Sequence, residues 1–460
     1  MRHPLVSWDQ RYVWHPFTQQ AEWKRRTPII IESARGVWLK TTDGRKLLDG
    51  NSSLWVNVWG HRKPELDRAL KAQIDKIAHS TFLGLTHEPA IRLARELIAI
   101  APSGLARVFY SDNGSTAVEV ALKMAYQFWQ LSGRKKKTRF VSLKEGYHGD
   151  TLGAVSVGGV DLFHQRFRDL LFKGWQASLP DAASSALRAP SPSREKANSL
   201  SGKGEGWGKA ESFGDIERLI TRHHSRIAAV ILEPLIQGAS GMRVMPRGYL
   251  KHVETVCRRH NVLLIVDEVA TGFGRTGTMF AVEQENVQPD FLCVAKSLTG
   301  GYLPLAATLS TERIFRAFLG RYDEFKTFFH GHTYTANPLA CAVALENLRL
   351  YKKEKLIMRL QPRIRQLCQG LAKLAQHPHV KEVRQIGLMA GIELVADKAT
   401  GQPYKPAQRL GLRVCDAALE RGLWLRPLGD TVVLMPPLGI SKIEMDFLLR
   451  GVQSAIQYAT

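Results

Sequence analysis

The chain has 460 residues, a formal net charge of +22 at pH 7 and a hydrophobic fraction of 44%. This length and hydrophobic fraction predict a globular protein with a large domain and a smaller companion, and they exclude a chain too polar to fold. No stretch approaches the ~20 apolar residues of a membrane span, and the first residues lack the apolar core of a secretory signal, so we expect a cytoplasmic protein without membrane segments.

The first 100 residues predict short strands followed by two helices. Residues 36–40 and 46–49 flank a turn and predict a β-hairpin. Helical periodicity follows over residues 64–78 and 88–100. Between the hairpin and the helices, Trp55 stands in an aromatic segment near a glycine. Its indole is equally consistent with packing in a core and with contact to a ligand.

A strand, a turn and a helix form a candidate anion site between residues 107 and 130. The strand at 107–110 runs into Ser-Asp-Asn-Gly-Ser-Thr, and the helix pattern covers residues 117–130. Such a turn presents free backbone N–H groups, a hydroxyl and the positive end of a helix dipole. It predicts a site for a single phosphate monoester, because the nucleotide-loop pattern is absent. The alternative is an ordinary helix N-cap.

The densest basic run, residues 134–139, follows this helix at the end where cations complement the helix dipole. The high positive charge raises nucleic acid as a partner, but no zinc-finger or aromatic RNA-binding pattern accompanies it. The five scattered cysteines form no CxxC pair, which argues against disulfides and structural zinc. We predict a solvated basic surface, no nucleic-acid partner and no metal.

An aromatic residue framed by glycines follows the next predicted strand, residues 139–143. Tyr147 lies between Gly146 and Gly149, where a ring is able to stack on a flat cofactor. Further along, residues 177–210 are rich in Ser, Ala, Gly and Lys, which predicts a flexible surface insertion.

A helix is expected at residues 245–260. After it, two apolar runs, residues 262–266 and 291–295, dominate the centre of the chain. Consecutive apolar residues are typical of parallel strands buried on both faces. The runs end at Asp267 and Lys296, and strands of such sheets hold ligands at their carboxyl ends. A lysine amine forms a Schiff base with pyridoxal phosphate, and a carboxylate keeps the pyridine nitrogen of that cofactor protonated. The alternatives are a plain surface salt bridge or two unrelated loop residues.

Residues 272–277 match G-x-G-x-x-G but do not predict a dinucleotide site. No long amphipathic helix follows them, and the acidic end of the preceding strand would repel a pyrophosphate. We expect a tight irregular loop close to a ligand.

The pattern changes near Asn337, where long helices and shorter strands predict a separate α+β lobe. Helices are expected at 339–352, 357–374 and 407–420, and strands near 383–394 and 432–435. Within this lobe, Arg426 is flanked by apolar residues, which suits either a substrate carboxylate or an ordinary surface arginine.

Over nearly its whole length, the chain resembles the class III pyridoxal-phosphate aminotransferases of fold type I. The motifs that carry the resemblance are Ser111-Asp112-Asn113-Gly114-Ser115, Tyr147-His148-Gly149, residues 267–277 and Lys296. The resemblance implies bound pyridoxal phosphate and an α/β fold. It also implies a large domain (61–336) with a mostly parallel seven-stranded sheet and a small α+β domain (337–460), which residues 1–60 join.

The resemblance also implies roles for individual residues. Lys296 carries the cofactor and moves the proton during catalysis, with Asp267 at the ring nitrogen. Tyr147 stacks on one ring face and Val269 packs on the other. The remaining residues implied at the cofactor are Gly114, Ser115, His332 and Thr333. Because Thr333 reaches the phosphate of the neighbouring subunit in similar enzymes, a homodimer with shared active sites is expected.

Within the family, several segments resemble the branch that aminates 8-amino-7-oxononanoate to 7,8-diaminononanoate in biotin biosynthesis. The segments are residues 14–18, 146–151, 330–333 with 337–341, and 426–429 followed by 434–437. The residues implied at the small-molecule substrates are Phe17, Leu54, Trp55, Tyr147, Gly331 and Arg426. Arg426 is expected at the distal carboxylate of the keto acid.

The amino donor is the least constrained part of this prediction. Phe17, Leu54 and Val433 stand where users of S-adenosylmethionine carry Tyr, Trp and Tyr, and Leu54-Trp55 resembles the branch that uses lysine. We expect S-adenosylmethionine, with lysine as the alternative. The rival readings are another ω-amino acid or diamine aminotransferase, and a basic nucleic-acid-binding protein on the same scaffold.

Overall fold

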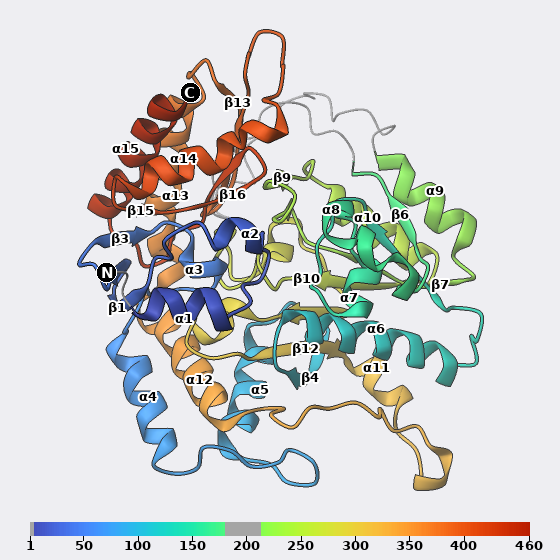
Figure 1. Cartoon of the computed structure of the whole chain (residues 1–460). Coiled ribbons are helices and arrows are strands. Elements are labelled where there is room, and N and C mark those ends of the chain that lie inside the picture. The colour runs from blue at the N-terminus through green and yellow to red at the C-terminus, as the bar shows by residue number, and fades with distance from the viewer. Residues whose placement is uncertain (1–3, 180–212) are drawn as a thin grey trace, which may run out of the picture.

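The computed structural model describes residues 4–179 and 213–460, built around a seven-stranded sheet (Figure 1). The strand order is β4-β12-β11-β10-β7-β5-β6. In that order the strands are Leu105–Ser111, Ala306–Thr311, Phe291–Val294, Leu263–Asp267, Ile227–Leu232, Arg139–Leu143 and Trp175–Ala177. Only β12 runs antiparallel to its neighbours, so the predicted mostly parallel α/β sheet is confirmed.

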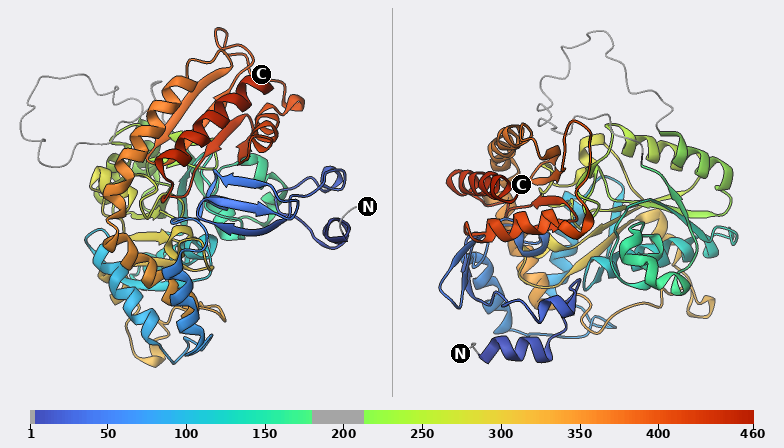
Figure 2. Two further views of the ribbon diagram at one scale, coloured as in Figure 1. Left: turned by 90° about the vertical axis from the view of Figure 1, so that its left-hand side faces the viewer. Right: turned by 45° about the horizontal axis from the view of Figure 1, so that its top comes forward.

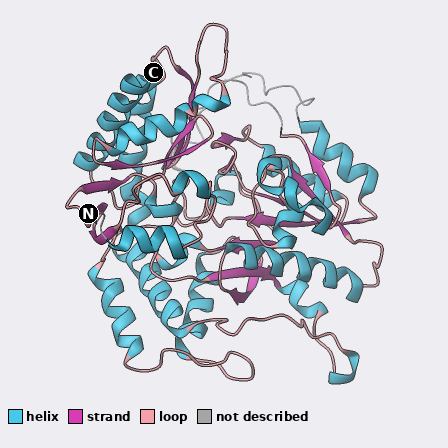
Figure 3. Cartoon of the chain, in the orientation of Figure 1, coloured by secondary structure: helices cyan, strands magenta, loops and turns pink. Residues whose placement is uncertain are grey.

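Both faces of this sheet are buried, as the apolar runs predicted. In β10, Leu264 and Val266 join one hydrophobic cluster, whereas Leu263 and Ile265 join another, because alternate side chains point to opposite faces. Helix α6 (Gly114–Leu131) covers one face. Helices α5 (Glu88–Ile100), α10 (Tyr249–Arg259) and α12 (Pro338–Lys353) contribute to the core on the other face. Figure 3 shows helices packed around the central strands.

Two of these helices begin at positions other than those predicted. Helix α6 starts at Gly114, three residues early, because the side chain of Asn113 accepts a hydrogen bond from the Thr116 N–H at 3.1 Å and caps the helix. Helix α10 starts at Tyr249 instead of residue 245, because Gly248 adopts a left-handed conformation with φ of 84°. The predicted helices at 64–78 and 88–100 are present as α4 (Pro64–Ile74) and α5.

The C-terminal elements gather around a second, antiparallel sheet of order β13-β14-β17-β16. Its strands are Val380–Ile386, Met389–Leu394, Thr431–Leu434 and Arg426–Leu428. The accompanying helices are α13 (Leu356–Leu374), α14 (Leu410–Leu419) and α15 (Lys442–Ala459) (Figure 2). Sequence reasoning omitted α15, although the capping box of Ser441 and Glu444 marks its start.

The N-terminal strands share a sheet with the C-terminal region. β1 (Ile31–Arg35), β2 (Trp38–Thr41) and β3 (Lys46–Asp49) are antiparallel, which includes the predicted hairpin. β3 also pairs in parallel with β15 (Leu423–Trp424), some 375 positions later. This pairing supports the expectation that residues 1–60 join the small domain, whose boundaries stay a prediction.

Two surface predictions are corrected by the structure. Ala177 belongs to β6, paired with β5, so the insertion does not begin there, and residues 180–210 lie outside the described residues. Lys137, predicted on a solvated basic surface, is buried and donates to the carbonyls of His224, Ile227 and Asn261 at 2.8, 3.1 and 2.8 Å. Burial lowers the pKa of Lys137 to about 8.

The G-x-G-x-x-G segment forms turns and is followed only by a short 3-10 helix, Ala281–Glu285, so no long helix follows it, as predicted. It packs against the C-terminal elements, and its expected closeness to a ligand stays a prediction. A Cβ on Gly274 would lie 3.0 Å from Ile357 in α13. Arg275 is fully buried and donates to the carbonyls of Pro436 and Asn57 at 2.7 and 3.0 Å. The segment therefore joins the large sheet to the C-terminal elements.

In the described part of the chain, no helix combines the length and the apolar character needed to cross a membrane.

Candidate active site

A cavity of about 680 Å³ lies at the carboxyl ends of five strands of the large sheet. The residues that follow β4, β5, β7, β10 and β11 all contribute to its lining. Seven of the predicted site residues line it together, namely Trp55, Gly114, Ser115, Tyr147, Asp267, Val269 and Lys296. This is where ligands bind in open α/β sheets, and the volume is typical of a small-molecule site.

Lys296 begins the turn that follows β11. Its backbone φ is 45°, a left-handed conformation that is uncommon for a side-chain-bearing residue. The partly buried ammonium lies 5.6 Å from the centre of the Trp55 ring. Burial lowers the pKa of Lys296, while the carboxylates of Asp267 and Glu233 act in the opposite direction. The amine is therefore nearer to its uncharged, nucleophilic form than an exposed lysine.

Asp267 is 4% exposed and is held at the end of β10 by two hydrogen bonds. Its Oδ1 accepts from the Val269 N–H at 3.0 Å, and its Oδ2 lies 2.8 Å from Nδ1 of His148. Among the described residues, no lysine or arginine forms an ion pair with Asp267. A buried carboxylate without a strong cation is suited to a positively charged ligand atom, such as a protonated ring nitrogen.

The N-terminus of α6 has an Asn113 N-cap, the alternative considered for this segment, and it also has the free N–H groups that the predicted anion site requires. The Asn113 side chain accepts a hydrogen bond from the Thr116 N–H, and the Asn113 N–H donates to the Thr116 hydroxyl. In the described chain, the N–H groups of Gly114 and Ser115 donate to no partner. A Cβ on Gly114 would lie 2.6 Å from Val269, and one on Gly149 would lie 2.0 Å from the Ser115 hydroxyl. Both glycines are therefore required for this close approach, and φ of Gly149 is +118°.

Tyr147 is fixed over the cavity from both ends. Its hydroxyl donates to Asp150 at 2.8 Å, and its backbone N–H donates to Glu233 at 3.1 Å. Burial, together with the hydrogen bond to Asp150, raises the pKa of Tyr147. The phenol therefore remains protonated, which fits a stacking role better than proton transfer.

A strained N-terminal segment brings Trp55 to Lys296. Ser52, Ser53 and Trp55 all have positive φ, of 50°, 59° and 65°. Asp49 holds the segment by accepting from the N–H and hydroxyl of Ser53 at 2.7 and 2.9 Å. Clustered left-handed residues are costly and concentrate at functional sites. Trp55 lines the cavity and also belongs to the main hydrophobic cluster, so core packing and ligand contact are compatible for this tryptophan, and its role at the substrate stays a prediction.

Six predicted site residues do not line the cavity, namely Phe17, Leu54, Gly331, His332, Thr333 and Arg426. All of these except His332 are exposed. Phe17 contacts Phe163 at 5.3 Å between ring centres, and Phe163 contacts Tyr147 at 6.3 Å. His332 Nδ1 lies 3.0 Å from a carboxylate oxygen of Asp112, which borders the cavity. The functional roles of these six residues, like those of the seven that line the cavity, stay predictions.

Two buried ionisable residues among those that line the cavity were not recognised from the sequence as parts of the site. Glu233 is buried after β7, accepts from the N–H of Gly238 at 3.0 Å, and has its pKa raised to about 7 by burial. His148 is buried against Asp267, and its Nε2 has no hydrogen-bond partner among the described residues. Glu233 directly follows β7, and Asp267 is the last residue of β10, so both carboxylates stand at the carboxyl end of a strand. This shared position could have identified Glu233 as a site residue from the sequence.

The cavity fits pyridoxal phosphate in each of its parts. The N–H groups of Gly114 and Ser115 suit the phosphate, and the carboxylate of Asp267 suits the ring nitrogen. Lys296 suits the aldehyde, because its amine has a lowered pKa. In its described part the chain has no cluster of residues able to hold a metal ion.

This fold and this site define a pyridoxal-phosphate-dependent aminotransferase. A model of the family described as aminotransferase class-III matches residues 19–456, so the chain belongs to the class III aminotransferases.

Several named class III aminotransferases are similar to this chain over nearly its whole length. The adenosylmethionine-8-amino-7-oxononanoate aminotransferase of Geobacter sulfurreducens is 48% identical over 456 residues, which cover 99% of this chain and 98% of the relative. The crystal structure of the protein with the same name from Methanocaldococcus jannaschii has a TM-score of 0.91 at 44% identity, covering 99% and 98% of the two chains. The omega transaminase of Pseudomonas jessenii in complex with PMP has a TM-score of 0.90 at 31% identity, covering 100% and 98%.

Proposed function

We propose that this enzyme transfers an amino group from S-adenosylmethionine to the ketone of 8-amino-7-oxononanoate, giving 7,8-diaminononanoate for biotin biosynthesis in the cytoplasm. The observation that carries this proposal is the cavity in which Lys296 faces Asp267, in a chain similar over 99% of its length to a relative named for that reaction. The reaction balances, since the donor amine becomes a ketone and the acceptor ketone becomes an amine.

The residues around the cavity are proposed to have different roles in this transfer. When bound, pyridoxal phosphate would supply an acceptor for the amino group and an electron sink for the reacting carbon. Lys296 would hold the cofactor through its uncharged amine and would be the base that removes the proton from that carbon. Asp267 would keep the ring nitrogen positively charged. The start of α6 would hold the phosphate through the N–H groups of Gly114 and Ser115.

The substrates are proposed to enter past Trp55 and Tyr147. Both are aromatic, line the cavity and suit the methylene chain of the keto acid. The keto acid also carries a carboxylate at its far end. Arg426 is exposed on β16, and in the described chain no carboxylate forms an ion pair with it, so it is free to take this role. Arg426→Ala should raise KM for the keto acid while leaving KM for the donor unchanged.

Incubation with 8-amino-7-oxononanoate tests the acceptor and the donor together. The purified enzyme is loaded with pyridoxal phosphate and given S-adenosylmethionine or lysine in separate reactions. The product 7,8-diaminononanoate is measured by mass spectrometry. We expect it with S-adenosylmethionine. Product with lysine alone would favour the alternative donor, which the identities of Phe17 and Leu54 support. Activity only with ω-amino acids or diamines would overturn the biotin-pathway assignment.

We further propose a homodimer whose active sites are shared. Leu83 and Leu85 are 90% and 60% exposed in the single chain, as is Tyr334 at 61%. The two segments lie together, because the rings of His79 and Tyr334 are 4.8 Å apart. This apolar surface adjoins the exposed Thr333, so a second copy that covers it would bring Thr333 close to a neighbouring cavity.

Mixed dimers test whether the sites are shared. Lys296→Ala and Thr333→Glu subunits are each expected to be inactive as pure dimers. If each site combines Lys296 of one subunit with Thr333 of the other, a hybrid contains one intact site. Mixing under exchange conditions should then restore activity. Lack of recovery in hybrids verified by mass spectrometry would mean that each subunit works alone.

A further inference from the structure

One helix of the C-terminal half contacts both loops that carry the reacting groups. Asn347 and Tyr351 lie one turn apart on α12, so they share a face. Asn347 donates to the carbonyls of Ser297 and Leu298 at 2.8 and 2.9 Å, directly after Lys296. Tyr351 donates to the carbonyl of Phe273 at 2.8 Å, in the loop that follows Asp267. A single rigid element thus touches the loops after β11 and β10.

The amide of Asn347 has a determined orientation. The side chain is fully buried, and its Oδ1 accepts from the indole N–H of Trp59 at 2.8 Å. Because an indole nitrogen only donates, the oxygen of Asn347 must face Trp59 and its two N–H groups must face the two carbonyls. All three hydrogen bonds of this amide are therefore specific, and no other arrangement satisfies every partner.

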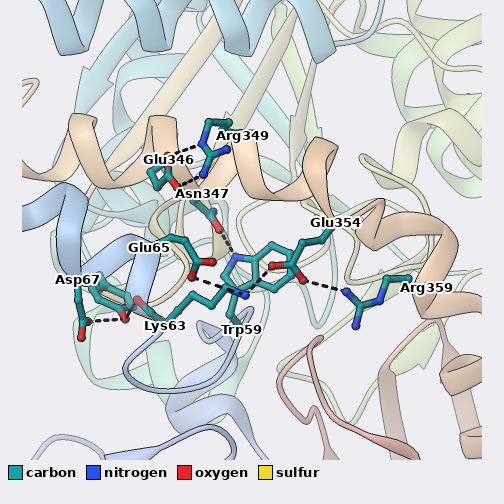
Figure 4. A network of polar contacts seen from close by, with 10 residues as sticks. Trp59, Lys63, Glu65, Asp67, Glu346, Asn347, Arg349, Glu354 and Arg359 are labelled. Atoms are coloured by element: carbon teal, nitrogen blue, oxygen red, sulfur yellow. Dashed lines mark hydrogen bonds and ion pairs between the residues drawn. The ribbon is translucent and has the colours of Figure 1, made fainter.

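A polar network anchors this contact to neighbouring elements (Figure 4). The ammonium of Lys63 lies 5.0 Å from the Trp59 ring centre and 2.5 Å from a Glu354 oxygen just beyond α12. Glu354 also pairs with Arg359 of α13 at 2.8 Å. Lys63 therefore packs against the Trp59 ring, and the ion pairs of Glu354 fix α12 at its C-terminal end.

The turn that begins with Lys296 needs such support. It is a four-residue 3-10 turn, Lys296–Thr299, with left-handed backbone at both Lys296 and Gly300. Its own hydrogen bonds include those from the N–H groups of Leu298 and Gly300 to the carbonyls of Ala295 and Ser297, both at 3.0 Å, and one from the Thr299 hydroxyl to the Leu303 carbonyl at 2.6 Å. All of these bonds lie within residues 295–303, and short 3-10 turns are weakly stabilised by themselves. The two bonds from Asn347 add a connection to a separate helix, which helps to define the position of Lys296.

We propose that Asn347 and Tyr351 are positioning residues that set the separation of Lys296 from Asp267. Neither side chain lines the cavity, and both act through backbone carbonyls. The inference rests on the proposed role of Lys296 as the residue that carries the cofactor. A displacement of reacting groups by about 1 Å is able to slow catalysis by roughly a hundredfold.

Asn347→Asp is the sharpest test, because it keeps the shape and replaces both donors by acceptors. Gln385→Glu is the matched control. Gln385 is also fully buried and donates to two carbonyls, those of Ile364 and Gly387 at 3.0 and 2.9 Å, and it does not line the cavity. Both variants should unfold at lower temperature. The readouts are kcat, KM and the pH midpoint of the visible absorbance of enzyme loaded with pyridoxal phosphate.

We expect kcat of Asn347→Asp to fall about tenfold or more, with KM nearly unchanged and a shifted pH midpoint. Gln385→Glu should keep the kcat and the pH midpoint of the wild type. Equal kcat and midpoint in Asn347→Asp and the wild type would overturn the proposal, as would equal shifts in both variants. If Asn347→Asp does not fold, Tyr351→Phe removes one hydroxyl only, and an unchanged midpoint and kcat there would refute it. Absence of a cofactor band in the wild type would instead refute the proposed function.

Discussion

Neutralising Asp267 while keeping its shape should separate cofactor chemistry from folding. In Asp267→Asn, the amide oxygen still accepts from the Val269 N–H, and the amide nitrogen is able to donate to Nδ1 of His148. The variant should therefore fold. What it loses is a charged hydrogen bond to the ring nitrogen, worth about 1.5–3 kcal/mol. Because about 1.4 kcal/mol is a factor of ten, Kd for pyridoxal phosphate should rise roughly 10- to 150-fold.

The catalytic effect should exceed the binding effect, because the neutral amide no longer keeps the ring nitrogen protonated. With saturating cofactor, kcat should fall by roughly a hundredfold or more. Kd is measured by equilibrium dialysis, and kcat by product formation over several cofactor concentrations.

Glu268→Gln is the control for the adjacent position. Glu268 is fully buried and accepts from the N–H groups of Ala281 and Val282, both at 2.9 Å, but it does not line the cavity. Its neutralisation should lower stability and leave cofactor affinity unchanged. A folded Asp267→Asn enzyme with wild-type Kd and kcat would refute the reasoning.

Three further predictions follow from the site. Reduction with borohydride in the presence of pyridoxal phosphate should attach a pyridoxyl group to Lys296 in the wild type, and none in Lys296→Ala; an equal adduct in the variant, seen by mass spectrometry, would assign the role to another lysine. Gly149→Ala should weaken cofactor binding tenfold or more, because its Cβ would meet the Ser115 hydroxyl. Gly104→Ala, also at positive φ but in open space, should cost only about 1 kcal/mol of stability and leave that affinity unchanged. Burial raises the pKa of Glu233 from 4.5 to about 7, so its contribution to folding is complete below pH 4.5 and is lost as the pH rises through 7. The free energy of unfolding of the apoprotein, relative to Glu233→Gln, should therefore fall by about 3 kcal/mol between pH 4.5 and 8, and parallel pH curves would contradict this.

The sequence was informative wherever a local pattern determines structure. Unbroken apolar runs identified β10 and β11, and the residues that end them, Asp267 and Lys296, lie in one cavity. The glycines and hydroxyls after β4 predicted the anion cradle, because a helix N-terminus is defined by adjacent residues. Even α15 had a readable start at its capping box.

The sequence was uninformative where distant segments meet. Nothing near Lys137 indicates that three carbonyls from two other loops would bury its ammonium. The pairing of β3 with β15 and the contact of Asn347 with the turn after Lys296 depend on tertiary packing across many positions. Trp55 was ambiguous for the same reason, since its ring meets Lys296, far later in the sequence, only in the folded chain.

The cavity is assembled from two kinds of backbone, and this has an evolutionary consequence. The reacting groups stand on ends of strands in a rigid sheet, whereas much of the remaining wall comes from irregular segments at residues 55–56 and 301–305. Mutations in those segments are able to reshape the space around a substrate without moving Lys296 or Asp267. A library confined to residues 52–56 and 302–305 should therefore yield enzymes with new amine preferences that retain transaminase chemistry.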